Sequence, residues 1–386
     1  MTSLPPIDST ILPTCPNRSA QSAYELVLEA ERAAMEDINR LDARVVGFLM
    51  INLCDSRPWL GDLPLSQVTK EVLLCNTKNA NDRIFVLGGQ YREKLLRAFR
   101  QSKGPPDPSS YVSRPSFDFL QDMVDNFLEE SPTDYRYARK VSMARDGFRC
   151  MITGAYDSNS LVKAPELRTR MLEDDDSGET IIQCCHILNE YAAQNIDSGN
   201  PSRNKRREYT FSVFEVLRKF GLQTIIDRLS VADGIHSLSN VLTLRSELCD
   251  HFDNLRIWLE PTSEENTYMV CEVHKSILRS YRNVKTQVHF EVSADACKYF
   301  KKSGKPVDLP LPDCKLLAIH AVCAKVTHMS GADQYFARLE YDVEEFDFHV
   351  EDNDSAHLLH QLLDNVVLMR SKIGTEEVCS LEESPS

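Results

Sequence analysis

The spacing of apolar residues changes near Arg145, and this change constrains the fold more than any other feature of the chain. Before Arg145, apolar residues recur every three or four positions, which is typical of amphipathic helices. After it, short apolar runs and alternating segments are typical of strands. We therefore expect an α+β protein, in which a helical N-terminal region precedes a part that contains strands.

Three stretches before Arg145 predict helices. The first, Tyr24 to Ile51, is long enough either to pack on its own chain or to pair with a second copy. Further helices are expected from about Asp82 to Gln101 and from Ser116 to Glu130. Residues 105–114 between these two are rich in Pro and Ser, which is typical of a linker. Residues 1–20 are polar and are expected to be disordered.

Beyond Arg145 the sequence predicts a hairpin followed by mixed elements. The apolar run Cys150 to Gly154 and the run Thr180 to Leu188 are expected to be its two strands, joined by a long acidic loop. The later part is expected to contain a helix at 211–229, strands at 255–259, 267–273 and 284–292, and helices at 316–329 and 355–370.

The net charge of −14 argues against a protein that coats nucleic acid through bulk electrostatics. About −10 of this charge lies between Phe336 and Ser386, so residues 373–386 are expected to be an acidic, disordered tail. The middle of the chain is close to neutral and would tolerate phosphate. No apolar run has the ~18 residues of a membrane span, and none resembles a signal peptide. We expect an intracellular protein, nuclear or cytoplasmic, that is not secreted.

Three pieces in order carry the chemistry. The first is Arg145-Asp146-Gly147-Phe148-Arg149-Cys150, followed by Thr153-Gly154. The second is Cys184-Cys185-His186. The third is Asn240 and the apolar run after it, with Cys249-Asp250-His251-Phe252-Asp253 nine residues further on.

These pieces resemble the HNH nuclease domain that occurs in many fungal proteins. The resemblance covers roughly Arg145 to Glu260 and implies a ββα-metal core with an inserted helix, flanked by the helical N-terminal region and a mixed C-terminal region. It implies that His186 is the general base, in a polar cleft, and that Asn240 holds the loop beside it. It also places Cys185 and Cys249 at the metal positions, and a divalent ion, Mg²⁺ or Mn²⁺, between them.

The two cysteines depart from the family pattern, in which the last metal ligand is a His. Thiolates are poor ligands for Mg²⁺ and prefer Zn²⁺ or another soft ion. Each thiol has an alternative interpretation as a packed core side chain. His251 does not replace Cys249, because two residues along a helix turn a side chain by about 200°.

Basic residues around the motif are candidates for contacts with phosphate. They comprise the loop Arg203, Lys205, Arg206 and Arg207, and the flanking Arg145 and Arg149. The alternative interpretation of the loop, as an ordinary solvated segment, is the favoured one.

The sequence thus predicts a helical region at 21–104, an HNH-like domain at 115–275 and a mixed region at 276–372. The leading hypothesis is a metal-dependent endonuclease that hydrolyses phosphodiester bonds, with DNA favoured over RNA. The alternative is an inactive HNH-fold scaffold that binds nucleic acid or a protein partner.

Overall fold

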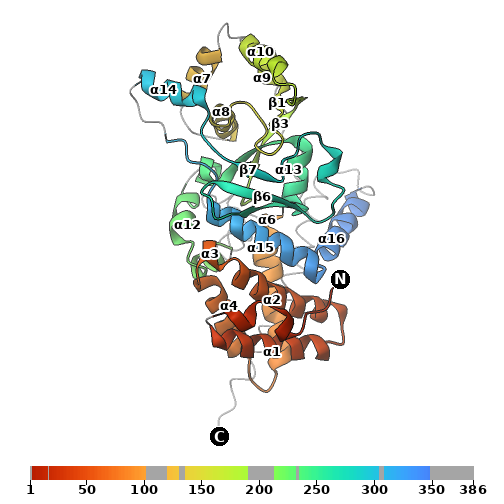
Figure 1. Ribbon diagram of the computed structural model, residues 1–386. Coiled ribbons are helices and arrows are strands. Elements are labelled where there is room, and N and C mark those ends of the chain that lie inside the picture. The colour runs from red at the N-terminus through yellow and green to blue at the C-terminus, as the bar shows by residue number, and fades with distance from the viewer. Residues whose placement is uncertain are drawn as a thin grey trace.

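The computed structural model describes residues 2–15, 17–100, 120–129, 135–189, 213–231, 234–303 and 308–347. It is an α+β structure, as expected. Figure 1 shows the N-terminal helices at one end, a three-stranded sheet in the middle, and a group of short helices and strands at the other end. The predicted linker 105–114, the helix at 355–370 and the tail 373–386 lie outside the described residues.

The N-terminal region is helical, but its first long helix is divided. A helix from Tyr24 to Ile51 was expected, whereas α1 ends at Ala33 and the chain turns through an extended Ala34 and a largely exposed Met35. Helices α1 and α2 pack on each other. The apolar spacing continues across the break because both helices bury one face. The bounds are α1 Arg18–Ala33, α2 Asp37–Asp55, α3 Arg57–Leu60, α4 Leu63–Leu74, α5 Ala80–Tyr91, a π-helical turn Arg92–Leu96, and α6 Arg97–Phe99.

The expectation that residues 1–20 are disordered is wrong for those that the structure describes. Two 3₁₀ turns, Ile7–Ser9 and Leu12–Thr14, lie against the helices. The Leu4 side chain is buried, and its backbone N–H donates to the Glu31 carboxylate. A few buried apolar side chains and the hydrogen bond between the Leu4 N–H and Glu31 hold this polar segment against the helices.

The predicted hairpin strand Cys150–Gly154 is also wrong. These residues form a turn, in which the Gly154 N–H donates to the Cys150 carbonyl and Gly154 adopts φ 74°. A glycine is suited to this positive φ because it has no Cβ. The surrounding elements are α7 Leu120–Glu129, α8 Tyr135–Arg145, β1 Tyr156–Asp157, α9 Ser158–Lys163, α10 Pro165–Glu173 and β2 Glu179–Thr180.

The actual partner of the second predicted strand is far away in sequence. Strand β3, Ile182–His186, pairs antiparallel with β4, Val241–Arg245. Helix α13, Ser246–Asp253, follows β4 without a loop and packs on both strands. Between β3 and β4, residues 213–219 are helical and α12 spans Gln223–Leu229. The predicted helix 211–229 is therefore interrupted, at Gly221 with φ 81°.

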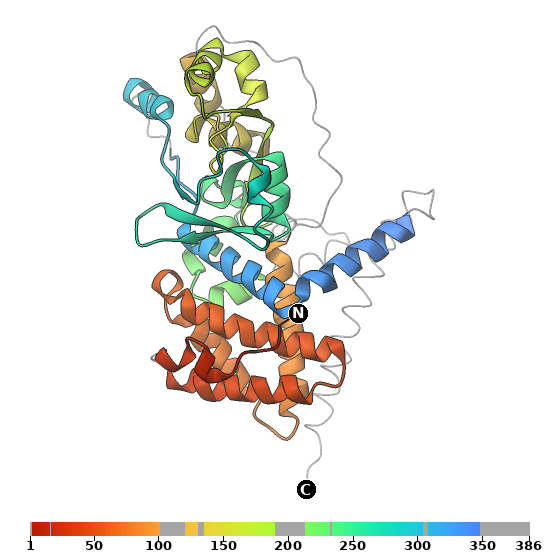
Figure 2. The same cartoon turned by 45° about the vertical axis from the view of Figure 1, so that its right-hand side comes forward.

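A three-stranded antiparallel sheet joins the two ends of the molecule. It consists of β5 Ile257–Pro261, β6 Thr267–Glu272 and β7 Gln287–His289. The strand predicted at 284–292 is shorter than expected. Helix α15, Cys314–Ser330, packs between β5 and α2, and it ends at Gly331 as predicted. Helices α14 Ala294–Ser303 and α16 Ala332–Asp347 complete the described chain, and α16 extends outward from α15 (Figure 2).

Candidate metal and catalytic site

The elements β3, β4 and α13 form a strand–strand–helix unit. In the β3–β4 register, Cys185 is opposite Leu242 and His186 is opposite Val241. Alternate residues of a strand point to opposite faces. Two helices, α8 and α13, each pack on both of these strands. The unit therefore has two faces, and neighbouring residues of β3 lie on different ones.

Asn240 holds the end of this unit together. Its side chain is fully buried, and its Oδ1 accepts a hydrogen bond from the Leu188 N–H at 2.8 Å. Its Nδ2 donates to the Leu188 carbonyl at 3.0 Å and to the Ile235 carbonyl at 2.9 Å. These bonds fix the chain two residues beyond His186. Asn240 thus ties the residues after β3 to the turn that precedes β4.

Three potential metal ligands meet where β3 faces α13. The ligand atoms of Cys185, Cys249 and Asp253 all lie within 4.8 Å of one another. The Cys185 thiol donates to Asp253 Oδ1 at 3.3 Å, and the Cys249 thiol donates to Asp253 Oδ2 at 3.6 Å. Cys249 and Asp253 share a face of α13, because residues four apart on a helix are neighbours.

Burial governs the protonation of this cluster. It raises the pKa of Asp253 to about 7, although the hydrogen bonds from the two thiols oppose this shift. A hydrogen bond with Cys185 lowers the pKa of Cys249, but burial and Asp253 outweigh it and raise that pKa to about 11. Burial also raises the pKa of Cys185. Both thiols are therefore protonated at neutral pH unless a cation lies between them, since a cation favours the thiolate.

The donor set fits a soft divalent ion. Two sulfur atoms and one carboxylate are ligands that Zn²⁺ accepts, and three protein ligands leave a position open. Mg²⁺ takes oxygen ligands in a near-octahedral arrangement, which this cluster does not offer. The residues present fit zinc or a similar ion, and they do not fit magnesium.

His186 lies at the end of β3, as predicted, but its surroundings differ from expectation. Its Nε2 lies 3.1 Å from Nδ1 of His236, and its ring lies 6.0 Å from that of Tyr135 on α8. His186 is thus on the α8 side of β3, while Cys185 points toward α13. Burial and the neighbouring His236 lower the pKa of His186 to about 3, so the imidazole is neutral at physiological pH.

Tyr135 lies beside His186 on the α8 side of the unit, with ring centres 6.0 Å apart. Burial raises the pKa of Tyr135, and the Cys184, Cys249 and Cys185 thiols add to this shift.

Of the arginines predicted to contact phosphate, the structure describes Arg145 and Arg149, and neither offers a free guanidinium to this site. Arg145 is fully buried; its guanidinium donates to the carbonyls of Leu238, Val241 and Pro310 and pairs with Asp146. The prediction is wrong for Arg145, because carbonyls of separate segments and the Asp146 carboxylate take up its donors. Arg149 is partly exposed and pairs with Asp174 at 3.4 Å. The loop residues Arg203, Lys205, Arg206 and Arg207 lie outside the described residues.

Sequence reasoning missed three residues of this region. Asp253 follows Cys249 by one helical turn, and this spacing was a usable signal. His236 and Tyr135 carried no such signal, because they approach His186 only through the tertiary fold.

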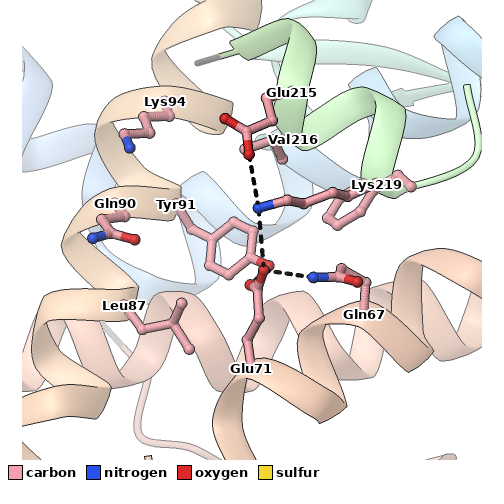
Figure 3. A pocket seen from close by; sticks show the side chains of 10 residues that line it. Gln67, Glu71, Leu87, Gln90, Tyr91, Lys94, Glu215, Val216 and Lys219 are labelled. Carbon is pink, nitrogen blue, oxygen red and sulfur yellow. Dashed lines mark hydrogen bonds and ion pairs between the residues drawn. The ribbon is translucent and has the colours of Figure 1, made fainter. Parts of the chain in front are cut away.

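A separate small cavity lies among helices α4, α5 and residues 213–219 (Figure 3). Its volume of about 70 Å³ suits two or three water molecules. The Tyr91 hydroxyl donates to Glu71 at 2.5 Å, Gln67 donates to the same carboxylate at 2.6 Å, and Lys219 pairs with Glu215 at 3.1 Å. Glu71 and Glu215 are thus both occupied by neighbouring polar side chains of the cavity.

No family model matches the chain, and neither a curated protein nor a solved structure matches it. Among the residues that the structure describes, no helix combines the length and the apolar character needed to cross a bilayer.

Proposed function

We propose that this chain is a metal-dependent phosphodiesterase of the HNH type that uses a soft divalent ion in place of magnesium. The observation that carries the proposal is the convergence of Cys185, Cys249 and Asp253 in a strand–strand–helix unit. His186 follows Cys185 in the chain and lies on the other face of β3, beside α8. The resemblance in sequence supports it, because Cys185, His186, Asn240 and Cys249 occupy the family's functional positions.

Each residue has a defined role in this proposal. Cys185, Cys249 and Asp253 would hold the ion, which when bound would stabilise the charge that develops on the scissile phosphate. His186 would accept a proton from the attacking water, and its lowered pKa leaves it in the neutral form that accepts one. Asn240 would keep His186 in place through the bonds to Leu188 and Ile235.

The metal site can be tested without any assay of activity. Titration of the purified protein with Co²⁺ should give the absorption band of a cobalt–thiolate bond, and Zn²⁺ should displace the Co²⁺. Cys185→Ala should abolish the band. Cys184→Ala is the matched control, because Cys184 is the adjacent buried thiol but packs with Ala138 and Val241 on the other face. An unchanged band in Cys185→Ala would contradict the proposed ligands.

The activity requires its own assay. Supercoiled plasmid should be nicked by the full chain with Zn²⁺ more than with Mg²⁺ or Mn²⁺, which prefer oxygen ligands, and His186→Ala should remove the nicking. General-base catalysis typically contributes ~10²–10⁴ in rate, so the loss should be at least about 100-fold. Equal nicking by wild type and His186→Ala would refute the assignment of the base.

One observation favours a second candidate function, an inactive scaffold of the same fold. His186 faces His236 on the α8 side of β3, and a pKa of about 3 makes it a weak base at neutral pH. In this reading the ion, where bound, only stabilises the unit. Binding of Co²⁺ without nicking under any metal condition would identify the scaffold.

A further inference from the structure

The connection between β6 and β7 is a basic, exposed segment of the described structure outside the site. From Val273 to Phe290 the sequence contains no Asp or Glu. Four cations are exposed within it, namely Lys275, Arg279, Arg282 and Lys285. In the part of the chain that the structure describes, none of the four side chains has an ion-pair or hydrogen-bond partner. We refer to residues 274–285 as the basic loop.

Apolar contacts hold the basic loop in one conformation. Ile277, Leu278, Tyr281 and Val284 are partly buried against the hydrophobic core. The Leu278 N–H donates to the Glu272 carboxylate at 2.7 Å, at a 3₁₀ turn spanning Leu278–Ser280. Because these residues point inward, the four cations between and beside them point to solvent. The cations are thus fixed to an ordered backbone.

The basic loop is attached to helix α13 and to β4. The Tyr281 ring lies 6.4 Å from that of His251, and the Arg245 guanidinium lies 4.6 Å from the Tyr281 ring centre. His251 is two residues from Cys249, about 200° around α13. The loop therefore flanks α13 away from the ligand cluster, so binding at the loop does not require the metal.

A cleft continues the basic loop at its C-terminal end. Lys285 and Arg149 line a hollow of about 380 Å³, together with the hydroxyl-bearing Thr153 and Ser177. Arg149 stacks on the Tyr156 ring at 4.0 Å, which holds its position. Asp174 and Asp176 also line the hollow, and Asp174 already pairs with Arg149. The surplus positive charge of this face thus comes from the loop.

We propose that the basic loop binds the phosphodiester backbone of nucleic acid. Four unpaired cations on a chain of net charge −14 are a local attraction for a polyanion that the overall charge would otherwise repel. Contacts made by charge alone fix position and carry no sequence preference. The choice of nucleic acid over other polyanions rests on the proposed function. The choice of the four binding residues rests only on the charge and exposure of the basic loop.

The salt dependence of binding tests the proposal quantitatively. A protein that neutralises Z phosphates of duplex DNA shows a slope of about −0.9Z in log K against log salt. Four contacts give a slope of about −3.6, or about 150-fold weaker binding when salt rises from about 50 to 200 mM. We would measure this by fluorescence anisotropy with a short labelled duplex and the full chain, in the presence of EDTA.

The decisive variant replaces Lys275, Arg279, Arg282 and Lys285 with Gln. This variant should lose most of the slope of log K against log salt. Each single replacement should reduce the slope by about 0.9, so the single variants test the proposal if the fourfold variant does not fold. The control replaces four exposed cations of the N-terminal helical region with Gln and changes the net charge equally. These are Arg18, Arg32, Lys70 and Lys78.

An equal loss of slope in both fourfold variants would overturn the proposal, because it would show an effect of net charge alone. Unaltered binding in the loop variants would overturn it too. Displacement of the duplex by polyglutamate at matched charge concentration would show that the loop binds an acidic polypeptide instead. Binding that depends on the loop, without nicking, would support this inference and count against the nuclease. Nicking without binding that depends on the loop would support the nuclease and overturn this inference.

Discussion

Replacing Asn240 with Ala should destabilise the protein strongly. The side chain makes three hydrogen bonds, to the Leu188 N–H, the Leu188 carbonyl and the Ile235 carbonyl, at 2.8 to 3.0 Å. Asn240 is fully buried. Water therefore cannot take the place of the lost amide without entering the core.

The magnitude follows from the three groups left behind. Each buried backbone group without a partner costs about 1–3 kcal/mol. Three such groups give a loss of about 3–5 kcal/mol at the lower end of that range. This is a large share of the 5–15 kcal/mol that typically separates folded and unfolded states.

Urea denaturation followed by circular dichroism would measure the change in the free energy of unfolding. Asn240→Asp is the informative companion, because it keeps an acceptor for the Leu188 N–H but loses both donated bonds. It should be destabilised as well. A loss below about 1 kcal/mol for Asn240→Ala would refute the argument, since it would mean that the partners of the amide are not buried or find other donors.

Three further predictions follow from buried groups. Arg145→Lys should cost about 3–5 kcal/mol, because a lysine cannot replace the contacts of the guanidinium, and it should leave the salt dependence of DNA binding unchanged in anisotropy measurements. Cys249→His should be destabilised by about 1–3 kcal/mol without metal, because the thiol is only 5% exposed, and Zn²⁺ should restore its thermal stability. Burial lowers the pKa of His320 from 6.5 to about 3, so the unfolded chain takes up a proton that the folded chain does not. Stability should therefore fall as pH drops through this window, by up to about 5 kcal/mol, and urea titrations of His320→Gln should show a weaker dependence on pH.

The two buried cysteines would also report on the site in a simple chemical experiment. Without metal, the raised pKa values of Cys185 and Cys249 make both thiols unreactive toward alkylating reagents at neutral pH. An exposed thiol such as Cys297 should react first. Faster alkylation of Cys185 than of Cys297, read by mass spectrometry, would contradict the burial that the structure shows.

The sequence by itself determined the elements that rest on local periodicity. The helices at 316–329 and 82–101 and the strands at 255–259 and 267–273 occur close to their expected positions, because the spacing of apolar residues directly reflects which face is buried. It also placed His186 at the end of a strand, because an apolar run precedes it. The role of Asn240 was implied by the family resemblance and not by the apolar spacing.

Only the tertiary structure decided which strands pair and which way the reactive side chains point. An apolar run such as Cys150–Gly154 fits a strand or a buried turn equally well, and the difference arises because β4 pairs with β3 in its place. The partners of His186 likewise come from α8 and from the turn at His236, which are distant in sequence. Arg145 was expected to contact phosphate because it flanks the first predicted strand, yet the carbonyls of Leu238, Val241 and Pro310 surround its guanidinium. The local sequence shows at which spacing residues are buried, and so where helices and strands form. Contacts between distant parts of the chain determine which strands pair, which way a side chain points and which charged groups surround it.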